Sequence, residues 1–311
     1  MSAADFWRPW EQKAESFDQA RDIIHSIFEK WTDDGRSFAW RGQVDASWPL
    51  HSSLYRRLFW TEGSSIDESR LYDEEGKILA EFHRWGLHRG ISGRLSVLNQ
   101  LAVMQHFGAP TRLVDVSFSP YIGLWFAVEK KWSNTTPTKE DVDGRLFAFD
   151  VTDRLINENA DKRDWEDCRK RPWRPSSVSA DDWCDDILAW RPPRFEDRIS
   201  AQHGGFLMGG VPKSWVHGSP RQWPKTTSSG GKWFQIDEVR SATSLPLRVH
   251  KLDSSDRGVR KNAVYTVRIT PKGKADIRKH LEKLYGYRHA TIYPDPTGFA
   301  QFAVPQLKSA P

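Results

Sequence analysis

The stretch Leu101–Val128 constrains the fold most, because it joins the end of one helix, a short strand and a second helix with little connecting chain. Apolar residues recur at helical spacing towards Gly108, and glycine is typical of the position just after a helix. Leu113–Phe118 then predicts a strand. Ser119–Pro120 is a typical helix start, and the apolar residues that follow predict a helix buried on nearly all sides.

Between these two apolar helices the chain carries a dense group of polar side chains: Gln105, His106, Thr111, Arg112, Asp115, Ser117 and Ser119. Polar groups that are buried without partners cost free energy, so they bind either one another or a ligand. Each has an ordinary structural explanation, such as a capped turn or an ion pair between Arg112 and Asp115. Their density favours a pocket over a core.

Length and composition limit the class of protein. A chain of 311 residues accommodates one large domain or two ordinary ones. It has no run of about 18 apolar residues, so we expect no membrane-spanning helix. Its first residues lack a signal-peptide pattern, and we expect a cytoplasmic protein. Cys168 and Cys184 form no recognised metal motif, so no metal site is expected; whether they are free thiols or a disulfide stays open.

A second informative stretch is Ser37–Gly42, which predicts a strand with alternating faces. The strand ends in the charged side chain of Arg41, which needs a partner. Two explanations are open. Arg41 forms an ion pair with an acidic neighbour such as Asp115, or it builds an anion site, because guanidinium pairs bidentately with phosphate. The adjacent Gly42 would let a ligand approach the backbone closely.

The remaining elements complete a fold prediction. Phe17–Trp31 predicts an amphipathic helix, and Ser65 with Glu68 predicts the capped start of a helix that continues towards Trp85. We further expect strands at 144–151, 206–208 and 263–270, a helix at 272–284, and a closing strand and turn at 290–302. This alternation predicts an α+β fold, a mixed sheet core with flanking helices. It is organised as an N-terminal helical segment at 1–36 and one domain at 37–305.

Two segments stand apart from this pattern. Residues 157–193 are rich in Trp and charged residues and predict an insertion with short helices at 161–169 and 181–189. Residues 211–231 predict a flexible loop. The net charge of +5 and the 16 tryptophans suit stacking on nucleic-acid bases or anchoring in a protein interface. We expect these segments, Trp173 and Arg174 in particular, to face a macromolecular target.

The motifs together resemble the FRG-domain family. Its Phe-Arg-Gly signature corresponds to Trp40–Gln43, and its Gln-His-x-Gly-x-Pro-Thr-Arg-Leu-x-Asp signature to Gln105–Asp115. Three further family patterns correspond to Ser119–Ala127, Gln202–Phe206 and Tyr293–Gly298. The resemblance extends over nearly the whole chain, from residue 37 to residue 302.

A second resemblance, to ADP-ribosyltransferases, implies a reaction. These enzymes carry an Arg on the first core strand, a Ser-containing strand before a helix, and a late strand with a catalytic Glu. Arg41, Ser117–Ser119 and Gln202 resemble the three elements. In that family the Arg holds the pyrophosphate or ribose of NAD, the Ser strand shapes the nicotinamide pocket, and the Glu stabilises the oxocarbenium-like transition state.

The resemblance implies a set of site residues for NAD as substrate. Catalytic roles fall to Arg41, His106, Asp115 and Gln202, and NAD binding to Arg41, Gln43, Gln105, Thr111, Arg112, Ser117, Ser119 and Tyr121. The sequence departs from the family at Gln202, because an amide carries no charge to stabilise a developing cation. Either another carboxylate serves, with Asp115, Glu196 and Asp197 as candidates, or the chemistry is altered, or the fold only binds a nucleotide.

The resulting functional hypothesis is an NAD-dependent mono-ADP-ribosyltransferase, a toxin or anti-phage effector whose partners are a macromolecular target and an antitoxin. The basic charge favours RNA or DNA over protein as the target. The alternative hypothesis is a non-catalytic sensor or interaction module that binds a nucleotide or a protein. Nucleophile-elbow, Walker, His-Glu-x-x-His and Cys-x-x-Cys motifs are absent from the sequence. We expect His106, Arg112 and Asp115 to converge with Arg41 on one cleft.

Overall fold

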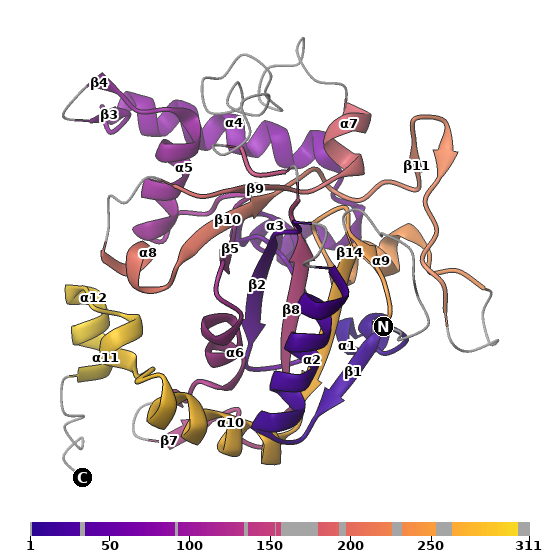
Figure 1. Cartoon of the computed structure of the whole chain (residues 1–311). Coiled ribbons are helices and arrows are strands. Elements are labelled where there is room, and N and C mark those ends of the chain that lie inside the picture. Colours follow the sequence, from indigo (N-terminus) through magenta and orange to yellow (C-terminus); the bar gives the residue numbers. More distant parts are fainter. Residues whose placement is uncertain are drawn as a thin grey trace.

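The computed structural model of the chain describes residues 2–31, 35–90, 93–133, 136–152, 154–156, 180–192, 197–225, 232–252 and 263–303. An eight-stranded mixed sheet with helices on both faces forms the centre of this described part (Figure 1). The predicted α+β class is therefore confirmed. The helices in the described part of the chain lack the length and apolar character needed to cross a membrane.

The sheet has the strand order β1-β14-β8-β2-β5-β10-β9, with the short β13 added beside β14. Strands β1 and β13 each pair with β14 in parallel, and all other neighbouring strands of the sheet are antiparallel. The strands span Glu11–Ala14 (β1), Phe38–Gln43 (β2), Val114–Ser117 (β5), Gly144–Asp150 (β8), Leu188–Trp190 (β9), Gly204–Met208 (β10), Arg248–Val249 (β13) and Ala263–Ile269 (β14). Three two-stranded hairpins lie apart from it: β3–β4 (Arg89–Gly90, Gly93–Arg94), β6–β7 (Lys131–Ser133, Thr136–Thr138) and β11–β12 (Trp215–Val216, Ser219–Pro220).

Helices cover the sheet on both faces. One face packs against α2, α6 and α10, and the other against α1 and α9. The helices span Ala3–Trp7 (α1), Phe17–Trp31 (α2), Ser53–Glu62 (α3), Glu68–Arg84 (α4), Val97–His106 (α5), Pro120–Val128 (α6), Ala180–Asp185 (α7), Asp197–Ala201 (α8), Ile236–Ala242 (α9), Pro271–Leu284 (α10), His289–Ile292 (α11) and Pro296–Gly298 (α12). Residues before position 37 thus contribute both a strand and helices to the same core.

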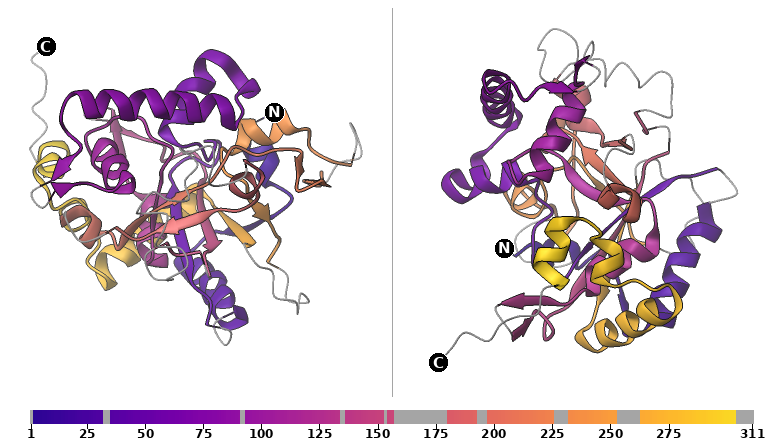
Figure 2. Two further views of the ribbon diagram at one scale, coloured as in Figure 1. Left: turned by 90° about the horizontal axis from the view of Figure 1, so that it is seen from above. Right: turned by 90° about the vertical axis from the view of Figure 1, so that its left-hand side faces the viewer.

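A separate apolar cluster packs α4 and α5 against β9 and β10, at the end of the sheet away from α10 (Figures 1 and 2). In Figure 1 the strands β9 and β10 run across the direction of β2 and β8. The turn in direction falls between β2 and β5. These two strands are paired at a single position, Trp40 opposite Ser117. Beyond it they separate, which opens the sheet.

Helix α6 approaches β2 very closely, through two glycines. A Cβ on Gly42 would collide with the carbonyl oxygen of Gly123 and the amide nitrogen of Ala127, and a Cβ on Gly123 would meet Trp40. Gly42 is therefore required by the packing of α6. The prediction that Gly42 lets a ligand approach the backbone closely is wrong, because α6 fills the space beside the Gly42 Cα.

Several predicted elements are confirmed with small shifts. The strands at 37–42, 113–118, 144–151, 206–208 and 263–270 and the helices at 17–31, 120–128 and 272–284 all form. Gly108 and Gly286 follow their helices with φ of 85° and 68°, as glycines after a helix do. Ser119 is the N-cap residue of α6 and Pro120 is the first residue of the helix, although the Ser119 side chain makes no capping hydrogen bond.

Other predictions are wrong. Helix α4 is capped by Asp67, whose carboxylate accepts a hydrogen bond from the Arg70 amide, and not by Ser65. The closing segment forms α11 and α12 in place of a strand, because Asp295 caps Gly298 and Pro296 starts a helical turn. Residues 181–189 split into α7 and β9. Part of the predicted loop at 211–231 is the β11–β12 hairpin. The helix at 161–169, Cys168, Trp173, Arg174 and Glu196 lie outside the described residues.

Replacing Gly42 with alanine should destabilise the fold, because the added methyl group meets backbone atoms of α6. We expect the free energy of unfolding in urea to fall by about 1–3 kcal/mol or more. Gly76→Ala is the control, since Gly76 is exposed within α4 with open space around it. Alanine there should leave stability unchanged or raise it by up to about 1 kcal/mol. Equal stabilities of G42A and the unmodified protein would contradict this packing.

Candidate functional site

A cleft of about 820 Å³ lies where β2 and β5 separate. Its walls come from β2, β5 and β10, from α3, α5, α6 and α8, and from residues that follow β2, α6, α8 and α11. Because the strands part, groups from both faces of β2 reach the cleft. Phe126 and Glu129 come from the α6 side, and Trp48 and His51 from the other.

Arg41 spans the gap between the separated strands. Its Nη1 donates a hydrogen bond to the backbone carbonyl of Asp115 at 2.5 Å and lies 3.8 Å from the Asp115 carboxylate. Its Nε is buried and has no hydrogen-bond partner within the described residues. Burial lowers the pKa of Arg41, Asp115 acts in the opposite direction, and Arg56 adds to the lowering. The guanidinium is therefore bound to the Asp115 carbonyl, lies at a long distance from the Asp115 carboxylate, and keeps its Nε donor for a ligand.

Asp115 is held by a chain of side chains. Gln105 donates to the Asp115 Oδ1 at 2.6 Å, and its own amide oxygen accepts a hydrogen bond from the Thr111 hydroxyl. Thr111 is anchored in turn, because its backbone amide donates to Ser53 Oγ at 2.9 Å. Gln105 and Asp115 line the cleft, whereas Thr111 lies behind them. Thr111 thus positions Gln105 and does not face the cavity.

Other expected site residues also line the cleft: Gln43, His106, Ser117 and Gln202. The Ser117 hydroxyl donates to the backbone carbonyl of Gln202 at 2.7 Å, which fixes the turn before β10 against β5. The Gln202 amide nitrogen donates to the carbonyl of Ile292 at 3.0 Å. Gln202 therefore joins β5, β10 and the closing segment, and its amide is partly engaged by the backbone.

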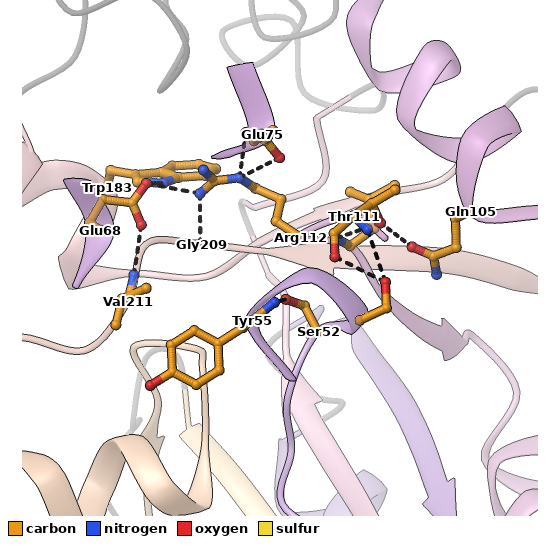
Figure 3. A network of polar contacts seen from close by, with 12 residues as sticks. Ser52, Tyr55, Glu68, Glu75, Gln105, Thr111, Arg112, Trp183, Gly209 and Val211 are labelled. Atoms are coloured by element: carbon orange, nitrogen blue, oxygen red, sulfur yellow. Dashed lines mark hydrogen bonds and ion pairs between the residues drawn. The ribbon is translucent and has the colours of Figure 1, made fainter. Parts of the chain in front are cut away.

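The expected convergence of Arg112 on this cleft is wrong. Arg112 is fully buried on the far side of its loop, where its Nε donates to both oxygens of Glu75 at 2.8 and 2.9 Å and its Nη1 to Glu68 at 3.0 Å (Figure 3). The Trp183 indole and the Val211 amide also donate to Glu68, each at 2.9 Å. Burial lowers the pKa of Arg112, but the two carboxylates outweigh burial and raise it. Arg112 holds α4 to the core.

Tyr121 and Ser119 are likewise outside the cleft lining. The Tyr121 ring stacks on Tyr285 with centroids 4.9 Å apart, and its hydroxyl is 3.2 Å from the His25 ring nitrogen. Burial, together with Tyr285, raises the pKa of Tyr121 to about 12. Both residues belong to the packing of α6.

The cleft also contains a buried carboxylate that the sequence pattern does not predict, that of Glu129. It accepts a hydrogen bond from the Tyr293 hydroxyl at 3.0 Å and pairs with Lys131. Burial raises the pKa of Glu129, while Lys131 opposes that rise. In the sequence Glu129 precedes two lysines and has the pattern of an exposed charged loop. Its position directly after the buried helix α6 was the available signal.

Two further cations reach the cleft. Arg198 of α8 lines it and is held by Asp295, with Nε···Oδ2 at 2.5 Å and Nη2···Oδ1 at 2.7 Å. Arg56 of α3 lines it beside Phe59 and Trp60. The cleft therefore combines cations, aromatic rings and one buried carboxylate. Among the described residues, groups of three His, Cys, Asp or Glu side chains able to hold a metal ion are absent.

Part of the chain matches a known protein-family model. Residues 36–136 match the model of the FRG domain, which covers both the Trp40–Gln43 and the Gln105–Asp115 signatures. This part of the chain therefore matches the FRG domain, as these two motifs predict. The later patterns at 202–206 and 293–298 lie beyond the matched residues. Neither the curated proteins nor the solved structures include a significant match to the chain.

Replacing Arg112 with methionine should destabilise the protein without acting on the cleft directly. The change leaves the carboxylates of Glu68 and Glu75 buried and uncompensated, a situation that costs about 3–5 kcal/mol. The measurement is urea denaturation followed by tryptophan fluorescence. Arg57→Met is the control, because Arg57 is exposed and outside the network. A stability loss no larger for R112M than for R57M would show that the buried network contributes little.

Proposed function

We propose that the protein is an NAD-dependent mono-ADP-ribosyltransferase and that this cleft binds NAD as a substrate. One observation carries the proposal: a guanidinium suited to pyrophosphate, Arg41, and a buried carboxylate, Glu129, line a single cleft. The resemblance to ADP-ribosyltransferases requires both kinds of group. Gln202, at the position expected for the glutamate, lines the same cavity.

The binding half of the proposal depends on Arg41. Its side chain is partly exposed, its ion pair with Asp115 is long at 3.8 Å, and its Nε has no partner within the described residues, so the guanidinium has donors for phosphate oxygens. Arg56 and Arg198 add positive charge along the same cavity. Apolar and aromatic surfaces from Phe59, Phe126 and other lining residues suit the flat rings of a dinucleotide.

The catalytic half depends on Glu129. In the reaction the bond between ribose C1′ and the nicotinamide nitrogen breaks, and nicotinamide leaves as a neutral molecule with the bonding electrons. Positive charge develops on C1′ and the ring oxygen, and the ionised carboxylate of Glu129 stabilises it inside a cavity of low polarity. An oxygen or nitrogen of the target then bonds to C1′ and gives its proton to Glu129 or to water.

The target is a macromolecule, with RNA or DNA favoured over protein by the basic net charge. The setting we propose for such an enzyme is a toxin or an anti-phage effector that is kept in check by an antitoxin protein. Trp173 and Arg174, proposed as target contacts, lie outside the described residues.

The alternative is a non-catalytic module that binds a nucleotide. It is favoured by one observation: the Glu129 carboxylate already has partners in Lys131 and Tyr293, and the Gln202 amide has one in Ile292. In such a module these groups stabilise the cleft, and NAD binds without turnover.

The test is to incubate the purified protein with NAD labelled on nicotinamide and, separately, on adenine, with pools of RNA, DNA and protein as acceptors. The enzyme releases nicotinamide and transfers the adenine label, whereas the module binds NAD saturably and releases nothing. Arg41→Lys should weaken NAD binding about tenfold or more, because it keeps the charge but loses the bidentate fork. Glu129→Gln should abolish turnover and preserve binding.

The pH profile separates Glu129 from other carboxylates. Since burial raises its pKa and only the ionised form stabilises the cation, turnover should fall as the pH drops through that raised pKa, above the usual range of a glutamate. The matched controls are Arg84→Lys and Glu282→Gln, both exposed and outside the cleft lining. Nicotinamide release that is unchanged in E129Q would reject the role of Glu129, and NAD binding unchanged in R41K would reject that of Arg41.

A further inference from the structure

The mouth of the cleft carries aromatic rings that face solvent. Trp60 on α3 lines the cleft and yet is 73% exposed, and Trp48 lines it and is 39% exposed. Phe107, directly after α5, is 80% exposed. Its ring packs edge-on against that of His106, another lining residue, with centroids 5.0 Å apart. Large exposed rings gathered at one opening mark an interaction surface.

Cations accompany these rings. The Arg56 guanidinium lies 6.0 Å from the centroid of Trp60. Arg57 donates from Nη2 to the carbonyl of Gly108 at 3.2 Å, which holds α3 next to the end of α5 and so brings Phe107 towards the same rim. Both arginines are exposed, and within the described part of the chain neither forms an ion pair.

The acidic residue of α3 does not cancel this charge. Glu62, at the end of the helix away from Arg56, is bound by Arg70 at 2.7 Å. Asp115 is an exposed carboxylate of the cleft, but it accepts a hydrogen bond from Gln105 and lies 3.8 Å from the Arg41 guanidinium. The rim, defined here as Trp48, Arg56, Arg57, Trp60 and Phe107, therefore offers positive charge and ring faces together.

We propose that this rim binds a single-stranded nucleic acid. A single strand presents phosphates and unstacked bases in alternation, and the rim pairs a guanidinium with an indole in the same way. A duplex hides the faces of its bases, and an acidic peptide satisfies the arginines but not the rings. That the bound strand is the acceptor of ADP-ribose rests on the proposed function; its binding does not.

The test is fluorescence anisotropy with labelled oligothymidylate and oligouridylate of about twelve nucleotides, a length within the range that single-strand binding sites cover. NAD is omitted, so binding is measured apart from any reaction. A duplex of the same length and polyglutamate serve as competitors. We expect single strands to bind and to be displaced by an unlabelled single strand much better than by duplex or polyglutamate.

Two variants address the two parts of the rim. Trp60→Ala should weaken binding at least about fivefold, since stacking of one base contributes about 1–3 kcal/mol. Replacing Arg56 and Arg57 together with alanine should weaken binding at every sequence. It should also flatten the slope of log affinity against log salt by about 0.7 for each phosphate that the variant no longer neutralises.

The matched control is Trp85→Ala. Trp85 is 74% exposed, close to the 73% of Trp60, but it is the C-cap residue of α4 and does not line the cleft. Equal losses in W60A and W85A, absence of binding at low salt, or equal competition by polyglutamate would overturn the proposal, the last in favour of an acidic protein partner. Strand binding without release of nicotinamide would keep this proposal and reject the enzyme. Release of nicotinamide without strand binding would do the reverse.

Discussion

The close packing of α6 on β2 is the constraint on which the rest of the structure depends. Two glycines, Gly42 and Gly123, let the helix and the strand approach to backbone contact. That contact fixes the start of α6 next to β5 and its end at Glu129. It also fills one face of β2, so the side chain of Arg41 projects from the other face, towards the gap where β5 departs. The Arg-Gly pair therefore serves two purposes: the arginine faces the cleft and the glycine makes the packing possible.

The central motif divides between two sites that the sequence could not separate. Gln105, His106 and Asp115 line the cleft, while Arg112, only three residues before Asp115, points into the core. The reason is geometric, because the residues of an extended segment alternate between its sides. The two sides of this segment face different neighbours. Arg112 therefore binds Glu75 and Glu68, whereas Asp115 binds Gln105. The density of polar residues indicated a pocket, but it did not indicate which of these residues line it.

Local signals predicted most of the elements. Alternating apolar residues predicted β2 and β8, and Pro120 and Gly108 marked helix ends, because turn and cap chemistry depends on neighbouring residues. The closing segment was misjudged for the same local reason: its Ile, Tyr and Phe residues favour a strand, but Asp295 and Pro296 favour a helical turn and prevail. The partners of Arg112 could not be predicted. Glu68 and Glu75 are brought to it only by the packing of α4.

The position of Glu129 shows how a fold can place a carboxylate in a cleft although the motif expected to carry one, at Gln202, has an amide. A carboxylate on a late strand and one after α6 are far apart in the chain, yet both can reach a cleft that opens between separated strands. At this position the carboxylate is buried, so its ionised form is costly unless cations or hydroxyl groups face it. Lys131 and Tyr293 provide that compensation. Positive charge that develops on the ribose would add to this compensation only in the transition state. An interaction that is stronger in the transition state than in the ground state accelerates a reaction. The same arrangement without a cationic transition state would be a stable, inert ion pair, so the chemistry of this cleft depends on the ligand that enters it.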